Sequence, residues 1–271
     1  MPISEDAIRS ELLDVCAKVE SLSDEEMLTG PSHLLEVPFR RLDVLASQEV
    51  DEETVDKILL DRDFQQVREA VARLRNVYSL RLEIEETRSI LESQDPWKTL
   101  KGFTFYPNYQ ILAETEQAGA YLSPGDTVAF LGSGPLPLSL IVLCSERGLK
   151  GIGIERVSEW AEISRKVLDR LGLQSEIVIL EGDQFTFPLE RECQLVMIAA
   201  MARPKEEIFR HLAEVLLPGT RVSYRIYENG LRRLLDLDHS FTPPPEFRET
   251  LRVRPKPPVN NTVIFLTRTN R

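Results

Sequence analysis

Hydrophobic positions in the first 95 residues recur at the three- and four-residue spacing of amphipathic helices, as Ile8 and Leu12 show near the start. Residues 63–91 continue this spacing over many turns and are predicted to form one long helix. The helix should end before Asp95 and Pro96, because the aspartate can cap a following helix and the proline can take its first position. No strand pattern interrupts this part of the chain, so we expect an N-terminal helical bundle domain over residues 1–120.

After residue 124 the pattern changes to short apolar runs that alternate with helical stretches. The runs predicted to be buried strands are residues 127–131, 151–155, 177–180, 195–198 and 221–227. Strands that alternate with helices favour a parallel sheet with right-handed crossovers. The last two runs, residues 248–253 and 262–267, are joined by a proline-rich turn and predict an antiparallel hairpin at the sheet edge. The expected fold is therefore α/β, with a Rossmann-like domain over residues 121–271.

Composition and charge narrow the function classes. The chain has 271 residues, 28% of them charged, and a formal net charge of −11. Binding to nucleic acid needs a basic face, so we expect no nucleic-acid partner. No apolar run is long enough to cross a bilayer and no basic leader precedes one, so we expect a cytoplasmic protein without a membrane partner. The scattered cysteines and histidines lack zinc-type spacing, so no metal is expected.

A glycine loop follows the first predicted strand, at the end of the sheet where open α/β proteins bind ligands. Its residues are Gly132, Ser133, Gly134, Pro135, Leu136, Pro137 and Leu138. Glycines here let the backbone approach a ligand closely. Glu155 ends the next strand at the position where an acidic residue binds ribose hydroxyls and repels a 2′-phosphate, which disfavours NADP.

The two prolines of the loop distinguish among the remaining nucleotide cofactors. Pro135 and Pro137 remove two N–H donors from what we expect to be the first turn of a helix. A pyrophosphate would need those donors, whereas a cofactor without phosphate loses nothing. S-adenosylmethionine carries ribose and adenine but no phosphate, so the loop favours it. A degraded dinucleotide site is the alternative.

Two further positions at strand ends belong to the expected cofactor site. Asp183 follows the third strand and could hydrogen-bond the adenine amine, although a turn or cap aspartate would look the same. Ala199 follows the fourth strand in a run of small residues, which indicates room for a ligand. The reacting groups should therefore come from elsewhere.

Several segments together resemble the nicotianamine synthases and the related bacterial enzymes that build staphylopine-type opine metallophores. The matching segments are Leu82-Glu83, Asp95-Pro96-Trp97, Phe105-Tyr106-Pro107-Asn108-Tyr109, the loop from Gly132 to Leu138, Tyr224-Arg225 with Gly230 and Arg232, and Val259-Asn260-Asn261-Thr262. They occur in the order of that family over about 180 residues. By default, the acidic run around Glu83 would be a solvated helix face, and the aromatic run around Phe105 a hydrophobic linker.

The resemblance implies a class I methyltransferase fold and a reaction that does not move the methyl group. These enzymes transfer the 3-amino-3-carboxypropyl (aminobutyrate) chain of S-adenosylmethionine to an amine and release 5′-methylthioadenosine. The bacterial members transfer it once, to histidine, and the compact C-terminus favours them here. Nicotianamine synthases repeat the transfer. A small-molecule methyltransferase is the other alternative.

The resemblance also assigns roles to residues outside the loop. Glu83 would hold the acceptor amine and take its proton, and Tyr109 would orient the amino-acid part of the cofactor or the amine. Arg225 could pair with a substrate carboxylate, or it could be an outward-facing strand residue. Phe105 is expected to contact the acceptor, and His33 either faces the acceptor or simply begins a helix. The long helix could also support a homodimer.

Overall fold

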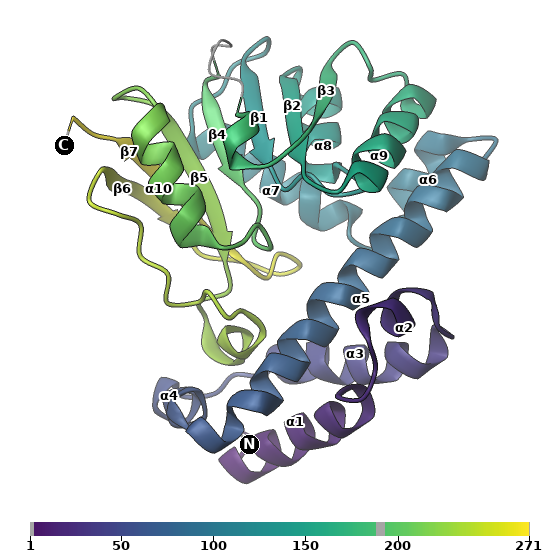
Figure 1. The fold of residues 1–271 in the computed structure, drawn as a ribbon, viewed down its shortest axis with the longest axis vertical. Coiled ribbons are helices and arrows are strands. Elements are labelled where there is room, and N and C mark those ends of the chain that lie inside the picture. The colour runs from purple at the N-terminus through teal and green to yellow at the C-terminus, as the bar shows by residue number, and fades with distance from the viewer. Residues whose placement is uncertain (1–2, 188–192, 271) are drawn as a thin grey trace. The chain divides into compact units, whose positions relative to one another are not determined.

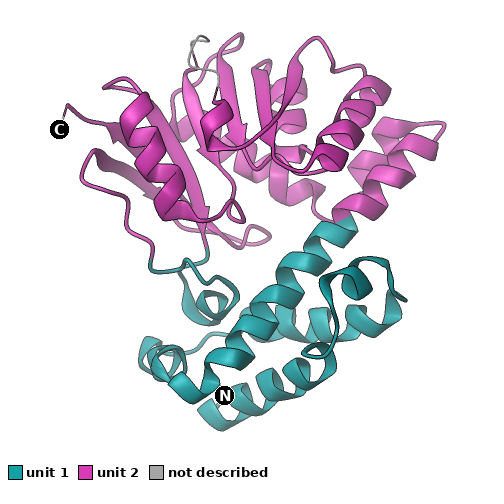
Figure 2. Ribbon diagram, in the orientation of Figure 1, with its two compact units in different colours: residues 1–82, 227–240 teal, residues 83–226, 241–271 magenta. Residues whose placement is uncertain are grey.

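The computed structural model describes residues 3–187 and 193–270 and divides the chain into two compact units (Figure 2). The first comprises residues 1–82 and 227–240, and the second residues 83–226 and 241–271. This division differs from the expected domain boundary at residue 120. The helices between residues 96 and 119 belong to the second unit, because they pack on helices that flank the sheet.

The first unit is helical, as the periodicity of the N-terminal half predicts. Its elements are α1 (Glu5–Val19), α2 (Asp24–Thr29), α3 (His33–Ala46), α4 (Glu52–Leu60), η1 (Arg62–Phe64) and the part of α5 (Gln65–Glu92) that ends at Leu82. Polar side chains begin three of these α-helices: Ser4, Ser23 and Asp51 each accept a hydrogen bond from a first-turn amide. One apolar face of each main helix is buried in a common core.

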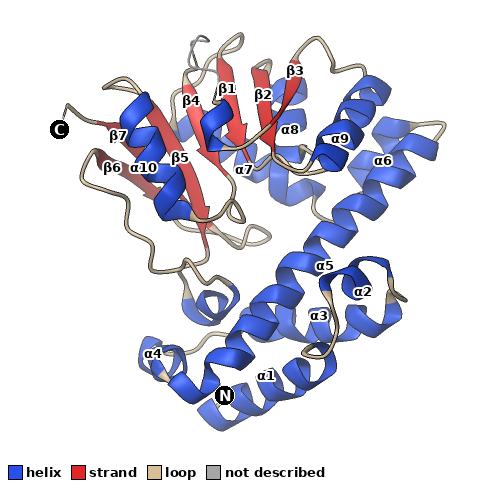
Figure 3. Ribbon diagram, in the orientation of Figure 1, coloured by secondary structure: helices blue, strands red, loops and turns tan. Residues whose placement is uncertain are grey.

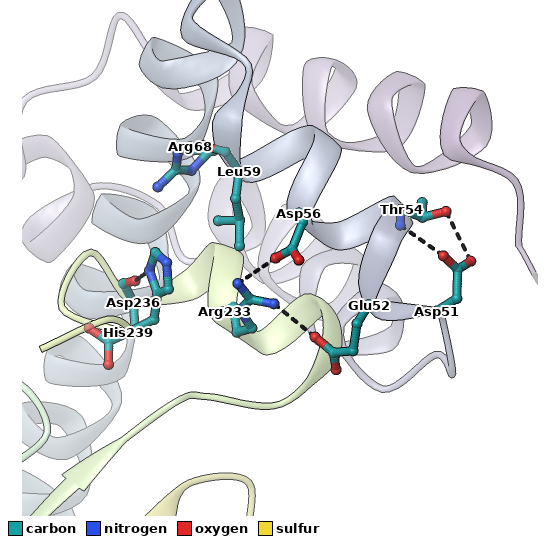
Figure 4. Close-up of polar contacts among 9 residues, drawn as sticks. All are labelled: Asp51, Glu52, Thr54, Asp56, Leu59, Arg68, Arg233, Asp236 and His239. Carbon is teal, nitrogen blue, oxygen red and sulfur yellow. Dashed lines mark hydrogen bonds and ion pairs between the residues drawn. The ribbon is translucent and has the colours of Figure 1, made fainter.

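A segment from the C-terminal half of the chain completes this helical unit. Residues 227–240 leave the sheet, form η3 (Gly230–Leu235) and bury three leucines in the helical core. Arg233 donates to Glu52 and Asp56 of α4 at 2.8 and 2.7 Å (Figure 4). The buried Asp236 accepts bonds from the amides of Tyr227 and Asp238 and thereby folds the segment back on itself. The sequence alone did not predict that residues 227–240 belong to the helical unit.

The second unit is built on a seven-stranded sheet with the order β3-β2-β1-β4-β5-β7-β6 (Figures 1 and 3). Its strands are β1 (Thr127–Leu131), β2 (Lys150–Glu155), β3 (Ile177–Glu181), β4 (Leu195–Ile198), β5 (Arg221–Ile226), β6 (Phe247–Val253) and β7 (Thr262–Arg268). β1 to β5 are parallel, and β7 pairs antiparallel with both β5 and β6. The predicted parallel sheet with an antiparallel C-terminal hairpin is confirmed.

Helices cover both faces of this sheet. They are α6 (Pro96–Gly102), α7 (Tyr106–Gly119), α8 (Leu138–Arg147), α9 (Ser158–Leu171) and α10 (Lys205–Val215), with a short η2 (Gln184–Thr186) after β3. Strand residues alternate between the faces. Tyr224 and its neighbours on one face pack with α10, whereas Ser223 and Arg225 on the other reach side chains of α7 and α8. No helix of the described residues is both long and apolar enough to span a membrane.

Candidate active site at the glycine loop

The glycine loop follows β1, and its two glycines adopt left-handed backbone angles. Gly132 has φ +80° and Gly134 has φ +72°, which side chains rarely tolerate. A Cβ on Gly132 would lie 3.3 Å from the Cβ of Ala199, and one on Gly134 would lie 3.2 Å from Oε2 of Glu83. The two glycines therefore let the end of β4 and the helix α5 approach the loop backbone.

Four of the five N–H groups of the loop have acceptors inside the protein. The hydrogen bonds run from Gly132 N and Ser133 N to Ile154 O (2.9 and 3.2 Å), from Gly134 N to Glu155 Oε2 (3.0 Å) and from Leu138 N to Leu136 O (2.7 Å). Pro135 and Pro137 have no N–H to offer. Few donors are left to cradle a phosphate, so the loop suits a ligand without one.

One detail of the prediction needs correction. The helix after the loop begins at Leu138, with Pro137 as its cap residue, so the prolines precede the first turn instead of forming it. Pro137 adopts ψ 56°, which is not helical. The prolines therefore remove donors from the loop itself, and the loop has few free amides with which to bind a phosphate.

Glu155 is 5% exposed at the end of β2, where the sequence placed it. Its two oxygens accept the amides of Gly134 (3.0 Å) and Val157 (2.9 Å). The carboxylate thus shapes the loop, a role that the sequence did not indicate. Each carboxylate oxygen has more than one lone pair, so Glu155 keeps acceptor capacity for ribose hydroxyls.

Glu83 also approaches Gly134, where an added Cβ would lie 3.2 Å from its Oε2, so two carboxylates lie close to one loop residue. Burial, followed by the negative charge of Glu155, raises the pKa of Glu83 from 4.5 to about 8. Two like charges in an enclosed place favour either a shared proton or a bound cation. A cationic ligand over Gly134 would relieve that repulsion.

Glu86 is a further acidic group of this region. It belongs to the acidic run that, by default, would form a solvated helix face. It follows Glu83 by three positions on α5, which places both on one helix face. Burial raises the pKa of Glu86, and its buried Oε1 has no hydrogen-bond partner. In the sequence, the spacing of three residues from Glu83 on a predicted helix already indicates that the two carboxyls share one face.

The remaining loop residues differ in which of their groups a ligand could reach. Ser133 is 4% exposed, and its Oγ faces Gly153, where an added Cβ would come within 2.9 Å of it. That hydroxyl is buried without a hydrogen-bond partner. Pro135 and Leu136 are buried in the unit, so a ligand would meet their backbone at most.

Tyr109 and Phe105 lie at the start of α7, which packs on α8, the helix that follows the loop. Both side chains are partly exposed. Their neighbour Tyr106 is buried, and its hydroxyl donates to Glu146 of α8 at 2.8 Å. That bond fixes α7, and the aromatic run is therefore partly a packing element.

Asp183 is exposed and caps η2 by accepting the amide of Phe185 at 2.9 Å. The interpretation of Asp183 as a capping residue therefore fits the structure, and its contact with adenine stays a prediction. His33 is the exposed first residue of α3 and lies in the helical unit, whereas the glycine loop lies in the other unit. The structure does not group His33 with the loop residues.

Arg225 does not face outward, and it is already paired. Its side chain is 6% exposed and lies 3.3 Å from Glu116 of α7. It also donates to Ser139 at 3.1 Å and lies over the ring of Phe130 at 5.7 Å. Because an internal carboxylate occupies it on the α7 and α8 face of the sheet, we leave Arg225 out of the substrate site.

Within the described residues no cluster of three His, Cys, Asp or Glu side chains could hold a metal ion. The groups that the structure does bring together are Glu83, Gly134 and Glu155, with Ala199 beside Gly132. This arrangement can hold a cation close to backbone and can store or accept a proton. It offers little to a phosphate.

Comparisons with known proteins show the family of the chain. The family model described as nicotianamine synthase protein matches residues 2–271. A probable nicotianamine synthase 2 of Hordeum vulgare is 27% identical over 63% of this chain and 55% of its own length. An L-histidine 2-aminobutanoyltransferase of Yersinia pestis is 22% identical over 61% of each chain. The matches thus span little more than half of these two curated relatives.

A solved structure is similar over nearly the whole chain. It is a glutamate-to-glutamine variant of the protein MtNAS in complex with S-adenosylmethionine. It is 28% identical, covers 96% of this chain and 98% of its own, and superposes with a TM-score of 0.83.

Proposed function

The chain belongs to the nicotianamine synthase family, and we propose that it transfers the 3-amino-3-carboxypropyl group of S-adenosylmethionine to the α-amine of an amino acid, with histidine as the favoured acceptor. The observation that carries the proposal is the pair of carboxylates, Glu83 and Glu155, that both lie close to Gly134. The histidine preference is supported by the resemblance to the bacterial transferases.

The residues at the loop fit this donor. S-adenosylmethionine has a positive sulfonium and a positive ammonium, and the two carboxylates would stabilise both charges. It has no phosphate to bind, in keeping with a loop in which four of the five amides are already bonded. Glu155 would in addition accept ribose hydroxyls, and Ala199 leaves space at the end of β4.

When bound, S-adenosylmethionine supplies electrophilic carbons next to its sulfonium sulfur. Glu83 would accept a proton from the acceptor's ammonium group, leaving the nitrogen lone pair free to form the new C–N bond. The C–S bond breaks at the same time, and the sulfur keeps its electron pair in 5′-methylthioadenosine. A base of pKa about 8 is well matched to an amine that is mostly protonated near neutral pH. Tyr109 would hold the reacting groups in line.

Product analysis tests the proposal. Purified protein, incubated with S-adenosylmethionine and either L- or D-histidine, should form 5′-methylthioadenosine and a histidine product heavier by one aminobutyrate unit, both identified by mass spectrometry. S-adenosylhomocysteine as the nucleoside product would overturn the proposal in favour of methyl transfer. Products with two or three aminobutyrate units would instead indicate repeated transfer, as in nicotianamine synthesis.

The raised pKa of Glu83 predicts a pH dependence. In the free enzyme the carboxyl is protonated below about pH 8, so kcat/KM for S-adenosylmethionine should fall about tenfold per pH unit below that value. A bound cation favours the carboxylate, so the corresponding limb of kcat should lie at lower pH. Initial rates from pH 6 to 9.5 measure both limbs. A kcat/KM profile that stays flat from pH 9.5 down to pH 6 would show that Glu83 is not the titrating group.

A further inference from the structure

The second unit contains a cavity of about 240 Å³ with walls from α6, α7 and α8. Two segments of the sequence resemblance contribute to it: Trp97 ends the Asp95-Pro96-Trp97 match, and Tyr106 belongs to the aromatic run. The proposed reaction uses neither of these two residues. The side chains that line the cavity are Trp97, Lys101, Tyr106, Ser145 and Glu146.

The cavity is separate from the glycine loop. The loop leads into Leu138, the first residue of α8, whereas Glu146 lies in the last turn of the same helix. The two positions are about 12 Å apart along the helix axis. The cavity therefore lies at the opposite end of α8 from the loop.

Internal hydrogen bonds hold the walls of the cavity in place. The indole N–H of Trp97 donates to the carbonyl of Leu171 at 3.1 Å. Glu146 accepts from the Tyr106 hydroxyl at 2.8 Å and from the Gln110 amide at 3.0 and 3.3 Å. Burial, followed by the hydrogen bond to Glu146 and its negative charge, raises the pKa of Tyr106, so the phenol stays a donor. An aromatic face and an oriented carboxylate are thus preformed.

Two opposite charges share the cavity without pairing. The Lys101 ammonium lies 5.7 Å from the centre of the Trp97 ring. No ion pair within 4.0 Å joins Lys101 to Glu146, or joins either of them to another of the described residues. Glu146 keeps acceptor capacity, because each carboxylate oxygen has more than one lone pair. Packing explains the hydrogen bonds of Trp97 and Tyr106, but it gives the two charges no partner.

We propose that this cavity binds a free α-amino acid as a zwitterion, at a second site distinct from the glycine loop. The ligand's ammonium binds Glu146, its carboxylate binds Lys101, and its side chain lies on the Trp97 ring. A simple amine or a simple acid would satisfy only one of the two charges. The volume of about 240 Å³ lies below the range of about 300–1,000 Å³ typical of sites for drug-sized ligands, which favours a ligand as small as an amino acid.

The fluorescence of Trp97 tests the proposal without any turnover. The chain has two tryptophans, so Trp160→Phe leaves Trp97 as the only tryptophan emitter. Titration of this variant with each of the common L-amino acids, up to about 10 mM, should give a saturable change with at least one of them. The amide and the N-acetyl derivative of that amino acid should each bind about tenfold more weakly, because each lacks one of the two charges.

Substitution of each charge in the Trp160→Phe background identifies its partner on the ligand. Lys101→Met should weaken binding about tenfold and remove the preference for the amino acid over its amide. Glu146→Gln, whose carbonyl can still accept from Tyr106, should do the same for the preference over the N-acetyl derivative. Lys98→Met is the matched control, because Lys98 is exposed on the same helix and does not line the cavity.

Three results would each overturn the inference: no saturable change with any amino acid, equal binding of the amino acid and both derivatives, or binding that survives both substitutions. The proposed transfer reaction is tested separately, because these titrations contain no S-adenosylmethionine. Lys101→Met should also leave KM for S-adenosylmethionine unchanged, since the cavity lies at the other end of α8 from the loop.

Discussion

Replacing Glu83 by glutamine should abolish most of the activity and at the same time stabilise the ligand-free protein. Glutamine keeps the shape of the side chain but cannot accept the proton of the acceptor amine, so kcat should fall by about 10²–10⁴-fold. Affinity for S-adenosylmethionine should change by less than about tenfold, because in the proposed site the ribose and adenine are bound by other residues. Single-turnover release of 5′-methylthioadenosine and calorimetric binding of the donor measure the two effects.

The gain in stability follows from the same enclosure. An unfolded glutamate ionises near pH 4.5, whereas Glu83 in the folded protein holds its proton up to about pH 8. Folding of wild type therefore takes up a proton between these pH values, and the stability contributed by this group falls as pH rises through that window. Glutamine avoids this loss, so Glu83→Gln should raise the melting temperature by several degrees at pH 8 and by little near pH 4.5.

Glu92→Gln is the matched control, because Glu92 is exposed near the end of the same helix. It should alter neither activity nor melting temperature. Glu83→Asp keeps the charge but shortens the side chain, so it should retain partial activity without the gain in stability. A fully active Glu83→Gln variant would remove the residue from the reaction, and an unchanged melting temperature at every pH would show that its carboxyl is solvated.

Local patterns were sufficient to predict most of the elements. α9 spans Ser158–Leu171 and β4 spans Leu195–Ile198, the limits expected from hydrophobic spacing. The cap at Asp95 and the antiparallel hairpin were also confirmed. Each of these depends on residues that are near neighbours in sequence, where periodicity and capping chemistry determine the structure.

Features that depend on distant residues could not be predicted in the same way. The core of the helical unit contains three leucines from the C-terminal half of the chain, Leu231, Leu234 and Leu235. No neighbouring residue in the sequence indicates that they belong to that core. The amide of Gly134 and the carboxylate of Glu155 are 21 positions apart, and their bond depends on how the loop crosses the sheet. From the sequence, Glu155 was predicted to bind the ribose hydroxyls. Its hydrogen bond to the loop amide could be recognised only in the folded structure.

Arg225 is the clearest example of this difficulty. An arginine at this position suggested a partner in the substrate carboxylate, but its partner is a carboxylate of the protein itself. Glu116 is 109 positions away and 1% exposed, and Ser223 donates to its other oxygen at 2.7 Å. Burial raises the pKa of Glu116, although Arg225 and Ser223 work in the opposite direction. The three side chains lie between the sheet and α7.

Arg225→Met should therefore destabilise the protein strongly and leave substrate recognition unchanged. Removing the guanidinium leaves the Glu116 carboxylate buried without its counter-charge, at a cost of about 3–5 kcal/mol. Denaturant unfolding of the second unit measures this loss, and KM for histidine, taken well below the melting temperature, should stay within about twofold of wild type because no ligand contact is removed.

The double variant Arg225→Met, Glu116→Leu tests the physical cause. With both charges gone, an apolar pair of similar volume should recover most of the lost stability, because the penalty of the single variant comes from the stranded carboxylate. If Arg225 instead bound a substrate carboxylate, the single variant would be nearly as stable as wild type and KM for the acceptor would rise. Such a result would return Arg225 to the binding site and leave Glu116 as a buried acid without its present partner.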